Sequence, residues 1–100
     1  MTGTARSSYG LDPRRGRALF RAWHRGTREM DLLLGRFADA YIGELSGPDL
    51  MRFEALMEVP DRDLFAWVTG REPVPANYET PLYRAIVAFH SAPKPGHEQS

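Results

Sequence analysis

The stretch WHRGTREMD, residues 23–31, holds the side chains best suited to chemistry. Five of its nine residues titrate: His24, Arg25, Arg28, Glu29 and Asp31. A guanidinium can donate two parallel hydrogen bonds to a carboxylate or phosphate, and a carboxylate can orient or stabilise a protonated group. Gly26 interrupts this run, although glycine is a poor helix former. From the residues alone, the pattern predicts a corner between two helices that Gly26 closes and that Arg25 and Glu29 flank as solvated charges.

Signatures of catalysis are absent from the sequence. It contains no phosphate loop, dinucleotide-binding glycine fingerprint, nucleophile elbow or HExxH motif. His24, His90 and His97 lack the spacing of metal ligands, and there is no cysteine for a thiolate site. Asp61 and Asp63 form a close carboxylate pair, but Asp61 is typical of a helix cap. We therefore expect no catalytic residue, no metal site and no enzymatic activity.

Charge is unevenly distributed along a chain whose net charge is zero. Residues 1–36 hold eight basic and three acidic residues, whereas residues 37–100 hold five basic and ten acidic ones. This asymmetry is typical either of a basic binding face or of two halves that pair with each other, and we favour the second. Nucleic-acid binding is the weaker interpretation, because the segment after Gly26 carries acids that would oppose phosphates.

Helix start and stop signals divide the chain into five segments. Asp12-Pro13 and Thr80-Pro81 each combine a capping residue with proline at the first helical position, and Ser46 caps a third start. Gly26 is suited to the position just after a helix, where the chain often adopts a left-handed conformation that closes the helix. The segments predicted to be helical are residues 13–25, 27–42, 46–57, 60–70 and 80–90.

Apolar residues recur at helical spacing in every segment, which predicts one hydrophobic core. Leu34, Phe37 and Tyr41 mark the stripe of the second segment, and Gly35 within it suggests a closely packed neighbour. No strand-like alternation appears, and no apolar run approaches the roughly 18 residues of a membrane span. The fold class is therefore all-α, a small five-helix antiparallel bundle. Residues 12–91 form the domain, between a flexible segment 1–11 and a disordered tail 92–100.

Two motifs carry a family resemblance. HRGTREMD resembles the Arg-Gly-x-x-Glu signature of the succinate dehydrogenase assembly factor family, which comprises small bacterial SdhE-type proteins and their mitochondrial counterparts. PDRDLFAWVTGREPVP resembles the family's second marker, a helix with Asp-Leu-Phe-x-Trp followed by a loop with glycine and proline. The segments LLLGRFADAYIGEL and FEALMEVPD lie between them at matching distances. The resemblance covers roughly residues 13–90.

The resemblance implies both a fold and a function. Members of this family are five-helix bundles that act as assembly factors rather than enzymes. They bind the flavoprotein subunit of succinate dehydrogenase, and often that of fumarate reductase, and they promote covalent attachment of FAD to a histidine of the client. We accordingly expect no stably bound cofactor, no nucleic acid and no membrane contact, a monomeric protein, and a cytoplasmic location in a bacterium or the mitochondrial matrix in a eukaryote.

The same resemblance assigns a partner-binding patch to Arg25, Gly26 and Glu29, with Asp31 beside them. His24 departs from the family pattern, in which an arginine often precedes the motif. The implied roles are a guanidinium fork from Arg25 to a client carboxylate or carbonyl, and a Glu29 carboxylate that orients or stabilises a group near the attachment histidine. Gly26 would permit close backbone approach.

Two residues of the second marker, Asp63 and Trp67, are interpreted as structural. We expect Asp63 in the first turn of its helix and Trp67 in the core. One further alternative of another class remains, a regulatory module of the antitoxin type, because some members of the family have been described as antitoxins.

Overall fold

Every regular element in the described part of the chain is a helix. The computed structural model describes residues 10–91. The helices are α1 (Pro13–Trp23), α2 (Arg28–Tyr41), α3 (Gly47–Met57), α4 (Asp61–Val68) and α5 (Pro81–Ser91), with short 3₁₀ turns η1 (Ile42–Glu44) and η2 (Ala76–Tyr78). The predicted all-α class with five helices is confirmed. Apart from residues 10 and 11, the two predicted terminal segments lie outside the described residues.

The helices start where the local sequence predicts. The side chain of Asp12 accepts a hydrogen bond from the backbone N–H of Arg15, and Pro13 follows it at the start of α1. Ser46 caps α3 in the same way, and Thr80 accepts a bond of 3.1 Å from Tyr83 N at the start of α5. Each cap satisfies a backbone donor that the first helical turn leaves unpaired.

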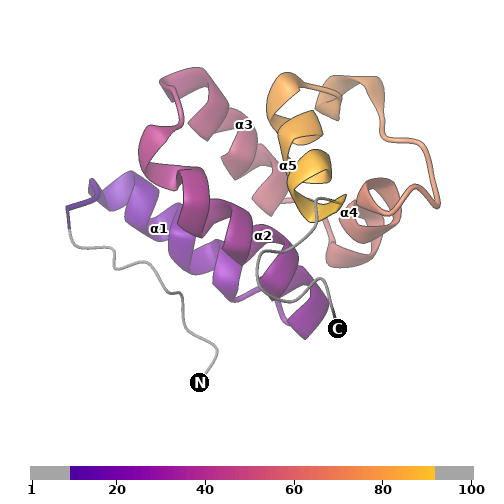
Figure 1. Ribbon diagram of the computed structural model, residues 1–100, viewed down its shortest axis with the longest axis horizontal. Coiled ribbons are helices and arrows are strands. Elements are labelled where there is room, and N and C mark those ends of the chain that lie inside the picture. The colour runs from indigo at the N-terminus through magenta and orange to yellow at the C-terminus, as the bar shows by residue number, and fades with distance from the viewer. Residues whose placement is uncertain (1–9, 92–100) are drawn as a thin grey trace.

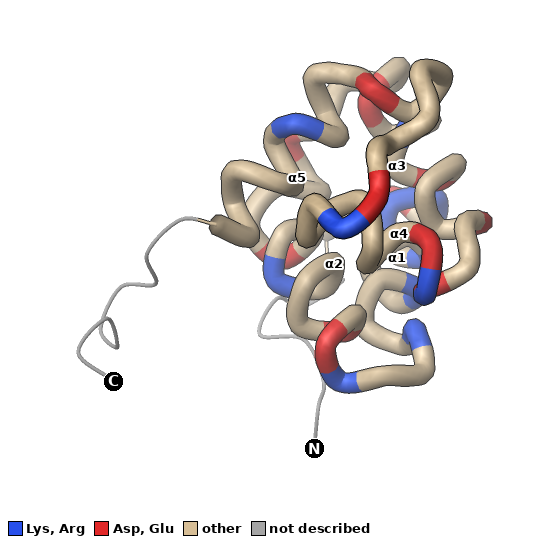
Figure 2. The backbone as a smooth tube through the Cα atoms, turned by 90° about the vertical axis from the view of Figure 1, so that its right-hand side faces the viewer, with Lys and Arg blue, Asp and Glu red and all other residues tan. Residues whose placement is uncertain are grey.

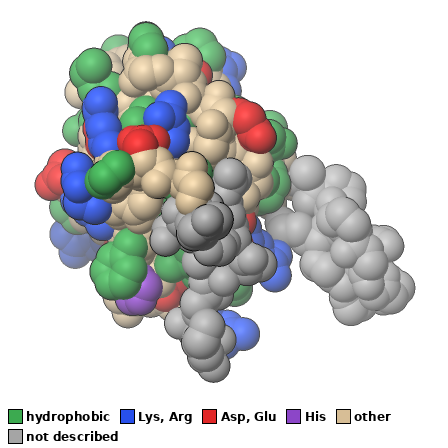
Figure 3. Space-filling model, turned by 90° about the vertical axis from the view of Figure 1, so that its left-hand side faces the viewer, with side chains coloured by type: hydrophobic (Ala, Val, Ile, Leu, Met, Phe, Trp, Pro, Cys, Tyr) green, Lys and Arg blue, Asp and Glu red, His purple; other side chains and the backbone are tan. Residues whose placement is uncertain are grey.

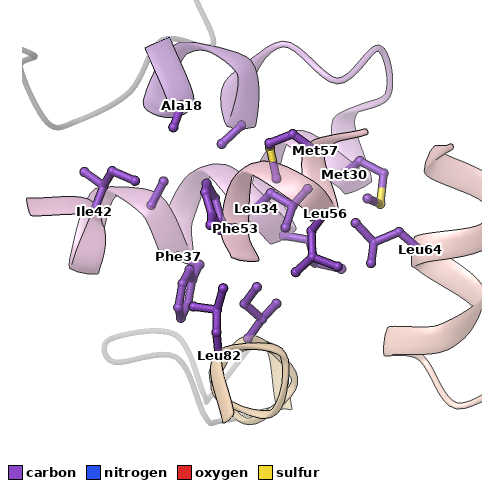
Figure 4. Packing of buried hydrophobic residues seen from close by; sticks show 14 of the residues in the cluster. Ala18, Met30, Leu34, Phe37, Ile42, Phe53, Leu56, Met57, Leu64 and Leu82 are labelled. Atoms are coloured by element: carbon purple, nitrogen blue, oxygen red, sulfur yellow. The ribbon is translucent and has the colours of Figure 1, made fainter. Parts of the chain in front are cut away.

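Helices α1 and α2 lie side by side and run in opposite directions, with α3 and α5 packed beside them and α4 toward one end (Figure 1). The core between them is entirely apolar in the described range, since no polar or charged residue is buried there. Figure 4 shows how α2 and α3 place aromatic and aliphatic side chains opposite each other. The largest fully buried side chains of the core are those of Phe37, Phe53, Leu19, Met30, Leu34, Ile42, Leu50, Leu56, Leu64 and Ile86.

The close neighbour predicted at Gly35 is the indole ring of Trp23. A Cβ atom added at Gly35 would lie less than 3.0 Å from three atoms of that ring. The indole N–H of Trp23 donates a hydrogen bond of 3.1 Å to Oδ1 of Asp39, one turn further along α2. The glycine thus lets the last residue of α1 lie flat against α2, which fixes the chain just before residues 24–31.

Two sequence expectations, for the end of α1 and for Tyr41, differ from the structure. Helix α1 ends at Trp23 rather than near Arg25, because His24 already leaves the helical conformation. Tyr41 lies on the predicted apolar stripe but is 44% exposed, since it sits at the end of α2 and contacts Phe37 and Phe89 from the edge of the core. Within residues 10–91, none of the helices is long and apolar enough to cross a membrane.

Candidate functional site: the corner between α1 and α2

Residues 24–31, here called the corner, turn the chain from α1 into α2. Gly26 has a φ of +110°, a left-handed conformation that strains any residue with a Cβ. Thr27 follows as the N-cap of α2, and its hydroxyl accepts a bond of 3.2 Å from Met30 N. The corner therefore has one local cause, a glycine followed at once by a capping threonine.

The Arg25 side chain turns inward from the corner. Its Nε donates to Oδ1 of Asp61 at 2.8 Å, while Nη1 and Nη2 donate to the carbonyl oxygens of Met57 and Val59 at 2.6 and 2.7 Å. Only 9% of the side chain is exposed. All three acceptors lie where α3 passes into α4. The guanidinium therefore ties the corner to the α3–α4 junction, and its donors are directed into its own chain rather than toward a client.

The Asp31 side chain also supports the corner from within. Its Oδ1 accepts a hydrogen bond of 2.7 Å from the backbone N–H of Arg25. This contact closes the turn, because it links the residue before Gly26 to the first turn of α2. Arg25 and Asp31 hold the shape of the corner together.

Glu29 points away from these contacts. It is exposed in the first turn of α2, where the partial positive charge of the helix N-terminus favours a carboxylate. It makes no hydrogen bond or ion pair with any other residue in the range 10–91. It borders a hollow between α2, α4 and α5 that Leu32, Arg36 and Phe65 also line. Glu29 is thus a charged group available for contact beside a partly apolar surface.

His24 forms the outer edge of the corner. It is exposed, its ring stacks on that of Phe20, and its Nδ1 lies 2.7 Å from the carbonyl oxygen of Phe20. The five residues predicted for partner binding therefore lie together, but His24, Gly26 and Glu29 face solvent whereas Arg25 and Asp31 support the backbone. Their joint assignment to partner binding stays a prediction.

Asp61 is the residue that the sequence interpretation misplaced. Pro60 occupies the N-cap position of α4 without any side-chain cap, so the predicted capping role of Asp61 is wrong. Its carboxylate instead accepts from Arg25. The prediction for Asp63 is confirmed, since it lies in the first turn of α4, while Trp67 is only partly buried and packs against Tyr78 with ring centroids 5.3 Å apart.

The basic residues of the first third of the chain pair with acids of the later helices. Ion pairs of 2.6–2.7 Å join Arg14 to Glu54, Arg21 to Glu58 and Arg25 to Asp61. The side-chain hydrogen bond from Arg14 lowers the pKa of Glu54 below its ordinary value. Both signs of charge are interspersed along the helices (Figure 2) and mixed on the face shown in Figure 3. This confirms the expectation that the two halves pair with each other, and it weakens the nucleic-acid interpretation.

A comparison with known protein families gives this corner a context. The sequence profile of the family described as "Flavinator of succinate dehydrogenase" matches residues 16–90. The chain belongs to this family. The match spans α1 to α5 and therefore includes both the corner and the α3–α4 junction.

Relatives within the flavinator family come from bacteria and from mitochondria. The chain is 42% identical over 77 residues to the "FAD assembly factor SdhE" of Acetobacter pasteurianus, a match covering 77% of this chain and 71% of the relative. It is 35% identical over 92 residues to the mitochondrial "Succinate dehydrogenase assembly factor 2" of Mycosarcoma maydis, covering 92% of this chain but 36% of that protein. It is 33% identical over 76 residues to the Dictyostelium discoideum protein of the same name, a match covering 76% of this chain and 54% of the relative. No solved structure matches the chain.

Proposed function

We propose that this protein binds the flavoprotein subunit of succinate dehydrogenase and promotes covalent attachment of FAD to that subunit. The observation that carries the proposal is an exposed Glu29 on a corner braced from within by Arg25 and Asp31, in a chain that belongs to the flavinator family. Its relatives are named as assembly factors for FAD or for succinate dehydrogenase, which supports the same function.

The mechanism we infer is preorganisation of the client. The flavin and a client histidine supply the bond-forming chemistry, and the factor holds no FAD of its own. A rigid corner docked on the flavin-binding part of the client would restrict its motion and hold reacting groups near each other, which lowers the entropic part of the barrier.

Each corner residue then has a separate task. Gly26 allows the client backbone to approach closely at this position, since glycine carries no side chain. Glu29 contacts the client, where its carboxylate orients or stabilises a protonated group near the attachment histidine. Arg25 acts as a positioning residue, because its donors are occupied by Asp61 and two carbonyl groups.

Flavin fluorescence of the client in a denaturing gel tests the proposal directly, because only covalently attached FAD remains. The flavoprotein subunit is expressed in a host lacking its own factor, alone or with wild type, Glu29→Ala or Glu72→Ala. Glu72 is the matched control. It is another exposed glutamate whose side chain has no partner in the described residues, and it lies in the loop that follows α4.

The expected result is strong fluorescence with wild type and Glu72→Ala, and weak fluorescence with Glu29→Ala or without factor. Equal fluorescence in all four samples would contradict the function itself. Equal fluorescence for wild type and both variants, above the sample without factor, would keep the function but remove Glu29 from it. The same comparison with a fumarate reductase flavoprotein tests whether that subunit is also a client.

A further inference from the structure

An exposed aromatic pair adjoins the corner and has no role in the core. Phe20 on α1 is 62% exposed, and its ring stacks on that of His24 with centroids 3.9 Å apart and planes inclined by 18°. Single exposed hydrophobic residues are common on protein surfaces. Exposure therefore assigns nothing by itself, and the argument depends on how the pair is held and where it lies.

The pair is held in one orientation. His24 Nδ1 lies 2.7 Å from the carbonyl oxygen of Phe20, and a carbonyl oxygen only accepts hydrogen bonds. Nδ1 therefore donates this bond, and in the tautomer that carries its proton on Nδ1 alone, Nε2 is left as an acceptor. Because this bond fixes the imidazole to α1 and the imidazole supports the phenyl ring, a partner would immobilise little additional side-chain motion on contact.

The pair also lies against the corner itself. Phe20 and His24 wall a shallow hollow whose other lining residues are Arg21, Arg25, Pro60 and Asp61. The charged groups that line this hollow are already in ion pairs, Arg21 with Glu58 and Arg25 with Asp61. The hollow therefore offers a partner an apolar edge and one imidazole nitrogen rather than a free charge.

We propose that Phe20 is a docking residue, seated in an apolar recess of the client flavoprotein while His24 Nε2 accepts a hydrogen bond at its rim. This inference rests on the function proposed above, because it takes the client that docks at the corner as the occupant. The argument for that occupant is continuity: Phe20 lies one helical turn before His24, where the corner begins, and shares its hollow with Arg25 and Asp61.

The test is a binding titration with purified flavoprotein subunit that lacks covalent FAD, using wild type, Phe20→Ala, Phe20→Leu and Met51→Ala. Met51 is a closely matched control, because it is 61% exposed on α3 and outside this hollow. Phe20→Ala should weaken binding about tenfold, as expected for an aromatic anchor. Phe20→Leu should recover part of the affinity, and Met51→Ala should bind like wild type.

The polar half of the proposal has its own variant. His24→Phe keeps an aromatic ring beside Phe20 but removes both Nε2 and the Nδ1 bond to the Phe20 carbonyl. It should bind more weakly than wild type and more tightly than Phe20→Ala. Thermal unfolding of each variant checks that the exposed substitutions leave the fold intact.

The outcomes separate this inference from the proposed function. If wild type binds and Phe20→Ala binds equally well, the docking role is overturned while the function stands. If wild type does not bind the flavoprotein, both fall together. Equal losses for Phe20→Ala and Met51→Ala would overturn the docking role, and so would a Phe20→Ala effect confined to self-association of the factor.

Discussion

The guanidinium of Arg25 and the carboxylate of Asp61 lie 2.7 Å apart, although 36 positions separate them in the sequence. The contact joins the first helix pair to the start of α4. The carbonyl groups of Met57, at the end of α3, and Val59, just after it, complete the set of acceptors around the guanidinium. The arginine of the family signature is therefore part of the internal structure, and substitutions there are expected to act first on stability.

Arg25→Ala should lower the free energy of unfolding by about 2–3 kcal/mol, because it leaves a partly buried carboxylate and two carbonyl groups without their donor. Urea denaturation followed by circular dichroism measures this loss. Arg14→Ala is the control, since it breaks a solvent-exposed pair with Glu54 and should cost much less stability than Arg25→Ala. Strictly additive effects of Arg25→Ala and Asp61→Ala in the double variant would contradict the coupling.

Gly26→Ala should destabilise the protein by about 1 kcal/mol, because alanine pays for the left-handed φ of +110°. Gly47→Ala should cost nothing comparable, since Gly47 has no positive φ and open space around its Cα. Thermal or urea unfolding compares the two.

Gly26→Arg distinguishes the effect of backbone strain from the effect of a blocked docking surface at the same position. It should lose about as much stability as Gly26→Ala but much more flavinylation of the client, since the long side chain would project from the turn into the docking surface. Equal flavinylation by the two Gly26 variants would show that the turn itself does not face the client.

Gly35→Ala should destabilise the protein by about 1–2 kcal/mol, although alanine is the better helix former. The added Cβ would collide with the indole of Trp23, which must shift away from α2. Urea denaturation measures the change, and near-ultraviolet circular dichroism should report the altered tryptophan environment. Unchanged or increased stability would mean that the ring moves aside without loss of packing.

Acid should weaken the link between α1 and α3. The hydrogen bond from Arg14 lowers the pKa of Glu54 below its ordinary value of 4.5 in the folded protein. A depressed pKa contributes stability above about pH 4.5 that is lost as the pH falls through the folded value. The stability advantage of wild type over Glu54→Gln should therefore shrink below pH 4.5 in a urea series. If Arg14→Gln kept the wild-type pH dependence, this pair would not be its source.

Features with local causes were predictable from the sequence, and long-range ones were not. The caps at Asp12, Ser46 and Thr80 depend on neighbouring residues, so short motifs revealed them. The tight packing at Gly35 followed from the cost of glycine inside a helix. Nothing near Arg25 or Asp61 in the sequence indicates that they meet, and the proline before Asp61 favoured a cap instead. The residues of the candidate site were named together, but their orientations required the fold.

Because the Arg25 side chain turns inward, its contacts depend on helices that come later in the chain. The Arg25 side chain finds its hydrogen-bond partners only where α3 and α4 have folded, because all three acceptors lie at their junction. A truncated chain that lacks α4 would keep the residues of the motif but would lose Asp61, the carboxylate partner of Arg25. Within one short motif, the arginine belongs to the internal structure of the factor, whereas the role proposed for the exposed glutamate is contact with the client.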